Sequence, residues 1–219
     1  MKSEIQSQIK HFIPWRAVWN NNSVTTPCRL VFDASQATSS GYSLNDLLAK
    51  GRNNMNKLVE ICVRWLIHKY AFHTDIQKMY NTVKLIEEDW CYQLYLWNEE
   101  LSLSKEPKIK AIKTLIYGVK SSGNQAESGL RKTAELQSKE YPKCNEIVQR
   151  DIYVDDCMSG ENTLEAVHSC TDNLKVVLNK GGFCLKGLTF SGNHPPTDLT
   201  VDGISINVVQ VCYGIPKMI

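Results

Sequence analysis

The sequence lacks the features that mark membrane-spanning and secreted proteins. Its 219 residues contain no run of about 18 apolar residues, which a membrane-spanning helix requires. The N-terminal stretch MKSEIQSQIKHF is charged and polar and holds no apolar core of the kind found in a secretory signal. The sequence therefore predicts an intracellular protein that has no membrane partner.

Two common metal-binding patterns and one catalytic pattern are also missing. The eight cysteines are scattered and none form a CxxC pair, which disfavours a zinc cluster and indicates free thiols. His68 and His73 are five residues apart, the wrong spacing for one helix face, and no HExxH frame surrounds them. An aspartic protease needs a D-[ST]-G loop, and the nearest approach, Asp33-Ala34-Ser35, lacks the glycine.

The composition is that of an ordinary globular protein. Hydrophobic residues make up 42% and charged residues 22%, so the chain can bury a core as one domain or two small subdomains. The net charge of +2 permits a nucleic-acid partner but does not by itself indicate one.

Hydrophobic periodicity predicts helices and strands without regular βαβ repetition. Helices are expected over 55–69 with Asn54 as the cap, over 121–139, and over 163–180, with a short helical piece near 44–48. Residues 1–27 read as an extended segment, and one or two strands are expected within 191–219. The other expected strands are 28–32, 70–75, 91–97, 109–117, 147–154, 157–160 and 183–190. This order favours an α+β fold in which helices back an antiparallel sheet.

The neighbouring acids Asp155 and Asp156 follow a β-branched run and Tyr153. Neighbouring side chains on a strand point to opposite faces, so both carboxylates reach one site only at a turn, such as a hairpin tip. Two neighbouring aspartates are more often found in a solvent-exposed turn than in a functional site. A functional hypothesis therefore depends on the residues around the pair.

The block Tyr153-Val154-Asp155-Asp156 resembles the YxDD box of reverse transcriptases, and four further segments resemble motifs of the same family. Residues 73–80, HTDIQKMY, resemble the motif in which a strand ends on a metal-binding aspartate. Residues 29–33 resemble the fingers motif R-x-V-x-D. Residues 116–123 resemble the glycine-bearing turn before the palm helix, and residues 181–186 resemble the segment after the second palm helix.

These motifs follow in the family's order over about residues 10–190. The segments SSGYSLNDLLAKG and GGFCLK look specifically like the BEL/Pao group of LTR retrotransposons. The resemblance implies a right-hand polymerase fold with a fingers-like region at 1–70 and a palm at 71–190. Residues 191–219 would begin the primer-grip or connection region, and the thumb would be missing.

The resemblance also implies a metal-dependent nucleotidyl transfer. Two Mg²⁺ ions, or Mn²⁺ as the alternative, would be bound by carboxylates, which are hard oxygen ligands. Asp75 and Asp155 would bridge both ions, Asp156 would be a looser ligand, and the carbonyl of Ile76 would add an oxygen. Without the YVDD block, Asp75 would read as a strand-end or helix-capping residue.

Substrate contacts follow from the same resemblance. Tyr80 would pack under the sugar and exclude a 2′-hydroxyl, which favours dNTPs, although core packing is an alternative for this ring. Arg29 would grip the triphosphate, unless it is a surface residue beside a strand. Gly118 would let the backbone approach the nucleotide, while Tyr117 and Lys120 would contact base and template phosphate.

Three further assignments remain open between functional and structural roles. Lys186 is a candidate proton donor to the pyrophosphate, or a surface lysine whose stem covers apolar neighbours. Tyr153, inside the YVDD block, is a candidate substrate contact. Trp15, Arg16 and Trp19 could form a template-stacking surface, but tryptophan packing of the N-terminal strand is the better interpretation.

The sequence thus predicts an RNA-directed DNA polymerase domain of a retrotransposon that extends a primer on an RNA or DNA template. Protease, RNase H and integrase domains would lie outside this chain. The site of action would be the cytoplasm, within virus-like particles, or the nucleus. The alternative is a truncated or domesticated relic that binds nucleic acid without catalysis.

Overall fold

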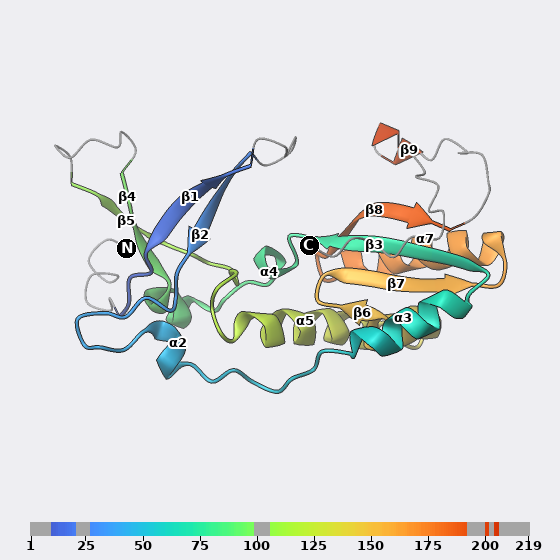
Figure 1. Ribbon diagram of the computed structural model, residues 1–219, viewed down its shortest axis with the longest axis horizontal. Helices are drawn as coiled ribbons and strands as arrows, with labels where there is room; N and C mark the ends of the chain where they lie inside the picture. The colour runs from blue at the N-terminus through green and yellow to red at the C-terminus, as the bar shows by residue number, and fades with distance from the viewer. Residues whose placement is uncertain (1–9, 21–26, 99–105, 192–199, 202–203, 206–219) are drawn as a thin grey trace. The chain divides into compact units, whose positions relative to one another are not determined.

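The computed structural model describes residues 10–20, 27–98, 106–191, 200–201 and 204–205 (Figure 1). The chain divides into two compact units that are interleaved in sequence: unit 1 comprises 1–53 and 80–126, and unit 2 comprises 54–79 and 127–219. The divisions at 70 and 190 that the sequence suggests for the fingers, palm and primer-grip regions stay a prediction. The interleaving arises because the sheet of unit 2 pairs a strand near residue 75 with strands beyond residue 150.

The core of unit 2 is a four-stranded antiparallel sheet in the order β6-β7-β3-β8 (Figure 1). Its central strand alternates in burial: Phe72, Thr74 and Ile76 are buried, whereas His73 and Asp75 are partly exposed. This period-two pattern gives the sheet a covered face and, around His73 and Asp75, an open face. The strand bounds are β3 (Tyr70–Gln77), β6 (Ile152–Tyr153), β7 (Asp156–Glu161) and β8 (Cys184–Phe190).

Helices pack onto this sheet, with α7 (Leu164–Asn179) behind it in the view of Figure 1. The side chain of Thr163 accepts a hydrogen bond from the Ala166 N–H and so caps the start of α7. Gly182, at a φ of 79°, follows the end of α7. The expected helix over 163–180 is therefore confirmed.

Helix α3 (Leu58–Ile67) begins later than the sequence predicted. Its N-cap is Lys57, and the Asn54 side chain donates to the Ser128 hydroxyl at 3.3 Å rather than capping α3. The buried face centres on Ile61, while Leu66 is 77% exposed. The error arose because Met55, which lies before the helix, fits the helical spacing of the apolar residues within it.

The expected strand over 147–154 is wrong in its first half. Residues up to Arg150 belong to helix α6 (Pro142–Arg150), which buries Cys144, Ile147 and Val148 at helical spacing. Only Ile152 and Tyr153 pair as a strand. The β-branched residues favour a strand by propensity, but burial of one helix face against α7 and the sheet outweighs that preference.

Two other expected strands are shorter than predicted. The first part of 91–97 belongs to a 3₁₀ helix, η1 (Glu87–Tyr92), and only β4 (Leu94–Trp97) is extended. It pairs with β5 (Lys108–Ala111), which covers the beginning of the expected 109–117. The helix expected over 121–139 is confirmed as α5 (Ser122–Leu136).

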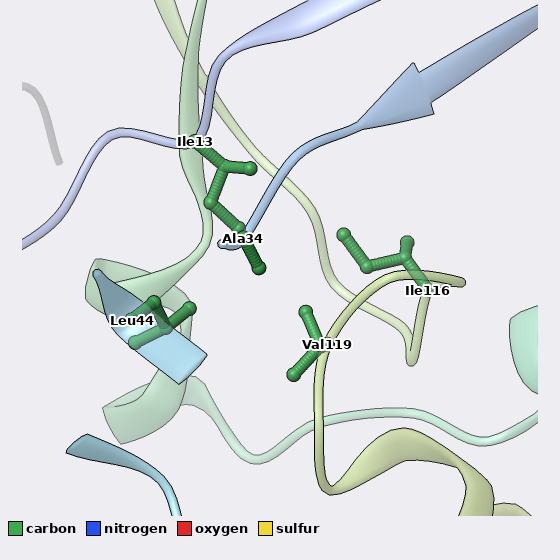
Figure 2. Close-up of a cluster of buried hydrophobic side chains, with 5 residues drawn as sticks. All are labelled: Ile13, Ala34, Leu44, Ile116 and Val119. Atoms are coloured by element: carbon green, nitrogen blue, oxygen red, sulfur yellow. The ribbon is translucent and has the colours of Figure 1, made fainter. Parts of the chain in front are cut away.

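Unit 1 contains two hairpins and a small apolar core. One hairpin joins β1 (Trp15–Trp19) to β2 (Cys28–Phe32), and the expected strand 28–32 is confirmed. The expected helical piece is α2 (Leu44–Leu47), which a capping box of Ser43 and Asp46 initiates. Figure 2 shows the buried cluster of this unit, formed by Ile13, Ala34, Leu44, Ile116 and Val119.

The remaining elements are short. Helix α4 (Met79–Thr82) follows β3, and β9 (Thr200–Val201) pairs with β10 (Ile204–Ser205). These two strands fall within the expected 191–219, whose other residues beyond 191 lie outside the described part, as do residues 1–9. The described helices include none long and apolar enough to cross a membrane. The seven described cysteines are free thiols, as expected.

A buried polar network ties α3 to the base of the β6–β7 hairpin. The Asp151 carboxylate accepts hydrogen bonds from Arg64 Nε at 2.9 Å and from the Ser159 hydroxyl at 3.0 Å. The Asp151 carbonyl accepts from the Met158 N–H at 2.9 Å. The side chain of Asp151 is 5% exposed and that of Arg64 is 26% exposed. Water therefore cannot readily replace the hydrogen bonds of Asp151 if they are broken.

Replacing Asp151 by alanine should lower the free energy of unfolding by about 3 kcal/mol, because it leaves Arg64 and Ser159 without their shared partner. This value is at the lower end of the range for a broken buried ion pair, since the Arg64 side chain is partly exposed to solvent. Urea denaturation measures the change. Glu146→Ala is the control: its ion pair with Arg150 is exposed, and it should change stability by less than about 1 kcal/mol. Equal losses in both variants would contradict the network's role.

Candidate active site

Asp75 lies directly beside the YVDD hairpin. In the β3–β7 pairing Asp75 is opposite Asp156, and the Ile76 N–H donates to the Asp155 carbonyl at 2.7 Å. The acid at residue 75 and the acids some 80 residues later thus share one end of one sheet. The metal-site hypothesis required this convergence, and the register provides it.

The hairpin tip takes one of the two neighbouring aspartates, Asp155, out of the strand pleat, whereas Asp156 is the first residue of β7. Tyr153 pairs with Asp156, so Val154 and Asp155 form a two-residue turn. Val154 has a φ of 57° and Asp155 does not have a positive φ, the combination of a type II′ turn. A β-branched residue at positive φ costs on the order of 1–3 kcal/mol and persists only where its surroundings impose it.

The open face of the sheet gathers a histidine beside these acids. His73 and Asp75 are two residues apart on β3 and so lie on the same face. Asp156 is opposite Asp75 and shares that face. His73 Nε2 lies 2.9 Å from Asp156 Oδ1. His73 was not among the site residues expected from the sequence, and the strand alternation around Asp75 was the signal that could have found it.

Lys186 is placed opposite Asp75 by a bulge in β8. The β3–β8 register shifts between His73 and Asp75, so that two residues, Gly187 and Leu188, oppose the single residue Thr74. Gly187 has a φ of 70°, a conformation that glycine adopts without steric cost. Thr189 pairs with His73 and Lys186 pairs with Asp75. Because of the extra residue in the bulge, Thr189 and Lys186 lie on the same face of the sheet although they are three residues apart.

Burial, together with neighbouring negative charges, raises the pKa of two of the three aspartates. Burial is the main reason that the pKa of Asp75 lies above its usual value, and the negative charges of Asp155 and Asp156 raise it further. Lys186 and His73 act in the opposite direction. Burial also raises the pKa of Asp155, with Asp156 adding to it. These carboxylates therefore repel one another and favour a bound proton or cation.

The donor chemistry of this site fits a hard divalent cation. Carboxylate oxygens are the ligands that Mg²⁺ prefers, and a cation would relieve the repulsion among Asp75, Asp155 and Asp156. Within the described ranges, no three His, Cys, Asp or Glu side chains already stand as a closed metal-binding group. The acids would thus have to adjust their side chains around an ion. The assignment of the Ile76 carbonyl as a ligand stays a prediction.

Most of the expected substrate residues lie in unit 1. The rings of Tyr80 and Tyr117 pack together with their centroids 4.2 Å apart. Gly118 has a φ of 95°, and a Cβ there would lie 2.7 Å from the Phe32 carbonyl oxygen, so only glycine fits. The Tyr80–Tyr117 pair therefore lies beside the turn before α5 that contains Gly118.

The other basic and aromatic residues have mixed placements. Lys120 Nζ donates to the Asn45 carbonyl at 3.1 Å, and Arg29 is exposed on β2. Trp15 packs on Trp97 with ring centroids 5.2 Å apart, which confirms the packing interpretation for this residue. Trp19 is 70% exposed, and Tyr153 is partly buried at the hairpin of unit 2.

Comparison with known proteins places the fold in the class of reverse transcriptases. No protein-family model matches the chain, and no curated protein sequence does. Solved structures of a foamy viral protease-reverse transcriptase do match. One, in complex with an RNA/DNA hybrid, has a TM-score of 0.56 at 15% identity, covering 81% of this chain and 21% of that one. Another, the CSH mutant of the prototype foamy virus enzyme, has a TM-score of 0.57 at 14% identity and coverages of 80% and 20%.

These similarities show the fold: a mixed arrangement of helices and antiparallel strands like that of reverse transcriptases. The chain spans about a fifth of the length of those proteins.

Without divalent cations, Asp75→Asn should raise the free energy of unfolding near neutral pH by up to about 1 kcal/mol, a figure limited by solvent screening of these partly exposed carboxylates. The raised pKa means that the folded wild type binds more protons than the unfolded chain above the ordinary value of 3.8. Wild-type stability therefore falls as pH rises from there through the folded-state pKa, and Asp75→Asn should flatten that fall.

Urea denaturation in a chelating buffer between about pH 4 and pH 7 measures the effect, a range chosen to bracket ordinary and raised carboxyl pKa values. Asp172→Asn, at an exposed aspartate of α7, is the control. A loss of stability in Asp75→Asn at neutral pH, relative to this control, would show that Asp75 is not held in a repulsive cluster.

Proposed function

We propose that this chain is the fingers-and-palm part of an RNA-directed DNA polymerase from a BEL/Pao-type retrotransposon. The supporting observation is the pairing of Asp75 with the YVDD hairpin, in a fold like that of reverse transcriptases. Unit 2, with the carboxylates, would supply the palm, and the hairpins of unit 1 would belong to the fingers. The thumb and the other polyprotein domains would lie outside this chain.

The proposed chemistry joins a primer 3′-hydroxyl to the α-phosphate of a dNTP and releases pyrophosphate. Asp75, Asp155 and Asp156 would hold two Mg²⁺ ions, which stabilise negative charge on the attacking and leaving oxygens when bound. Lys186, opposite Asp75, would carry the proton that the leaving pyrophosphate takes up. Its place on the same face as the acids supports this role over that of a remote surface lysine.

The nucleotide would be a dNTP because of an aromatic surface in unit 1. The Tyr80 ring is supported by Tyr117, and a rigid ring under the sugar would collide with a 2′-hydroxyl. Displacement of the α-phosphate by about 1 Å can cost on the order of 10²-fold in rate. The template and primer would be RNA or DNA, a proposal supported by the foamy viral structure that holds an RNA/DNA hybrid.

The full chain should extend a DNA primer annealed to an RNA template in Mg²⁺ or Mn²⁺. Asp155→Asn should reduce the rate by at least about 10²-fold, since it removes a charge that the transition state requires. Gel analysis of extended primers measures this, with Asp172→Asn as the control that keeps activity.

No extension at high protein concentration with either ion, together with salt-dependent nucleic-acid binding that ignores Asp155→Asn, would contradict the catalytic proposal. Those results would support the non-catalytic relic.

Tyr80→Val should increase ribonucleotide incorporation relative to dNTPs by about tenfold or more, because it removes the ring that excludes the 2′-hydroxyl. Tyr80→Phe keeps the ring and should retain the wild-type preference. Single-nucleotide extension with dNTP and rNTP measures the ratio for each variant. Equal ratios in Tyr80→Val and Tyr80→Phe would remove Tyr80 from the specificity assignment.

A further inference from the structure

We propose that His73 is a positioning residue that orients the Asp156 carboxylate toward the divalent cation of the carboxylate site. The inference rests on the proposed function and deepens it. It stands on one contact: His73 Nε2 lies 2.9 Å from Asp156 Oδ1, with both side chains on the open face of the sheet.

The strand register produces this contact. His73 is directly opposite Met158, and Asp75 is directly opposite Asp156. Asp156 is therefore a diagonal neighbour of His73 on the adjacent strand, a separation that a long side chain such as histidine can span. The burial of Phe72, Thr74 and Ile76 keeps His73 on the open face, so the pair depends on the same packing that places Asp75.

The chemistry of the pair fixes which atoms remain for a cation. An ionised carboxylate only accepts hydrogen bonds, so the proton of this bond is on Nε2 of His73. This bond uses one acceptor site of Asp156 Oδ1, and Oδ2, outside this bond, is left to bind a cation. The side chains of His73 and Asp156 are 36% and 45% exposed, which leaves an ion access to that second oxygen.

Holding a ligand in this way has a known energetic consequence. Carboxylates that bind metals are commonly oriented by a second residue, whose loss typically weakens metal affinity by 10–100-fold. Asp156 sits at the base of a strained turn next to two repelling carboxylates, so its rotamer would otherwise be free to swing toward solvent. His73 removes that freedom before the ion arrives.

Mn²⁺ titration of the full chain, followed by electron paramagnetic resonance without nucleotide, tests the proposal. His73→Ala should weaken Mn²⁺ binding by about tenfold. His73→Gln should recover most of the affinity, because its amide nitrogen can donate from near the Nε2 position. His168→Ala, on α7, where the ring packs with Phe190, should leave Mn²⁺ affinity unchanged.

A double-mutant cycle separates positioning from general stability. Asp156→Ala alone should weaken Mn²⁺ binding, and adding His73→Ala to it should cause no further loss, because the residue being oriented is gone. Additive losses would overturn the proposal. So would an unchanged or tighter affinity in His73→Ala, or a His73→Gln variant, folded by circular dichroism, that binds no better than His73→Ala.

The proposed function fails in a distinguishable way. If the wild type has no Mn²⁺ site that depends on Asp75 and Asp155, both the proposed polymerase site and the proposed role of His73 are contradicted. If that site exists and His73→Ala leaves its affinity unchanged, only the role of His73 falls.

Discussion

The antiparallel pairing of β3 with β7 is the constraint on which the candidate site depends. It places Asp75 opposite Asp156 and joins Ile76 to Asp155 through a backbone hydrogen bond. A slip of one residue would turn His73 and Asp75 into the covered face and expose Phe72, Thr74 and Ile76. Burial of these residues makes such a slip costly, so the hydrophobic core of unit 2 also sets the geometry of its acids.

The site itself works against the stability of the fold. It combines a valine at positive φ with carboxylates whose burial, and then mutual repulsion, raises the pKa of Asp75 and Asp155. Such features persist where the surroundings over-determine them. Here the surroundings are the packed helix α7 and the buried Asp151 network at the base of the same hairpin. The hydrogen bonds of Asp151 at the base of the hairpin thus help to hold the strained turn at its tip.

Local sequence patterns predicted the elements whose own residues decide their form. Helices α5 and α7 and strands β2 and β8 appear close to their expected bounds, because apolar periodicity, a capping threonine and terminal glycines are local signals. Helix α6 was mistaken for a strand because its β-branched residues favour extended backbone, and only packing against α7 reverses that preference. The start of α3 was misplaced because Met55, an apolar residue before the helix, continues the helical period.

The sequence alone determined which acids are present, their order along the chain, and the hairpin that carries two of them. Tertiary structure decided what those residues face. The His73–Asp156 contact joins residues 83 positions apart, and Lys186 meets Asp75 only because a bulge at Gly187 shifts the register. Neither follows from composition or spacing, because register is set by the burial of an entire sheet face and not by the residues that come into contact.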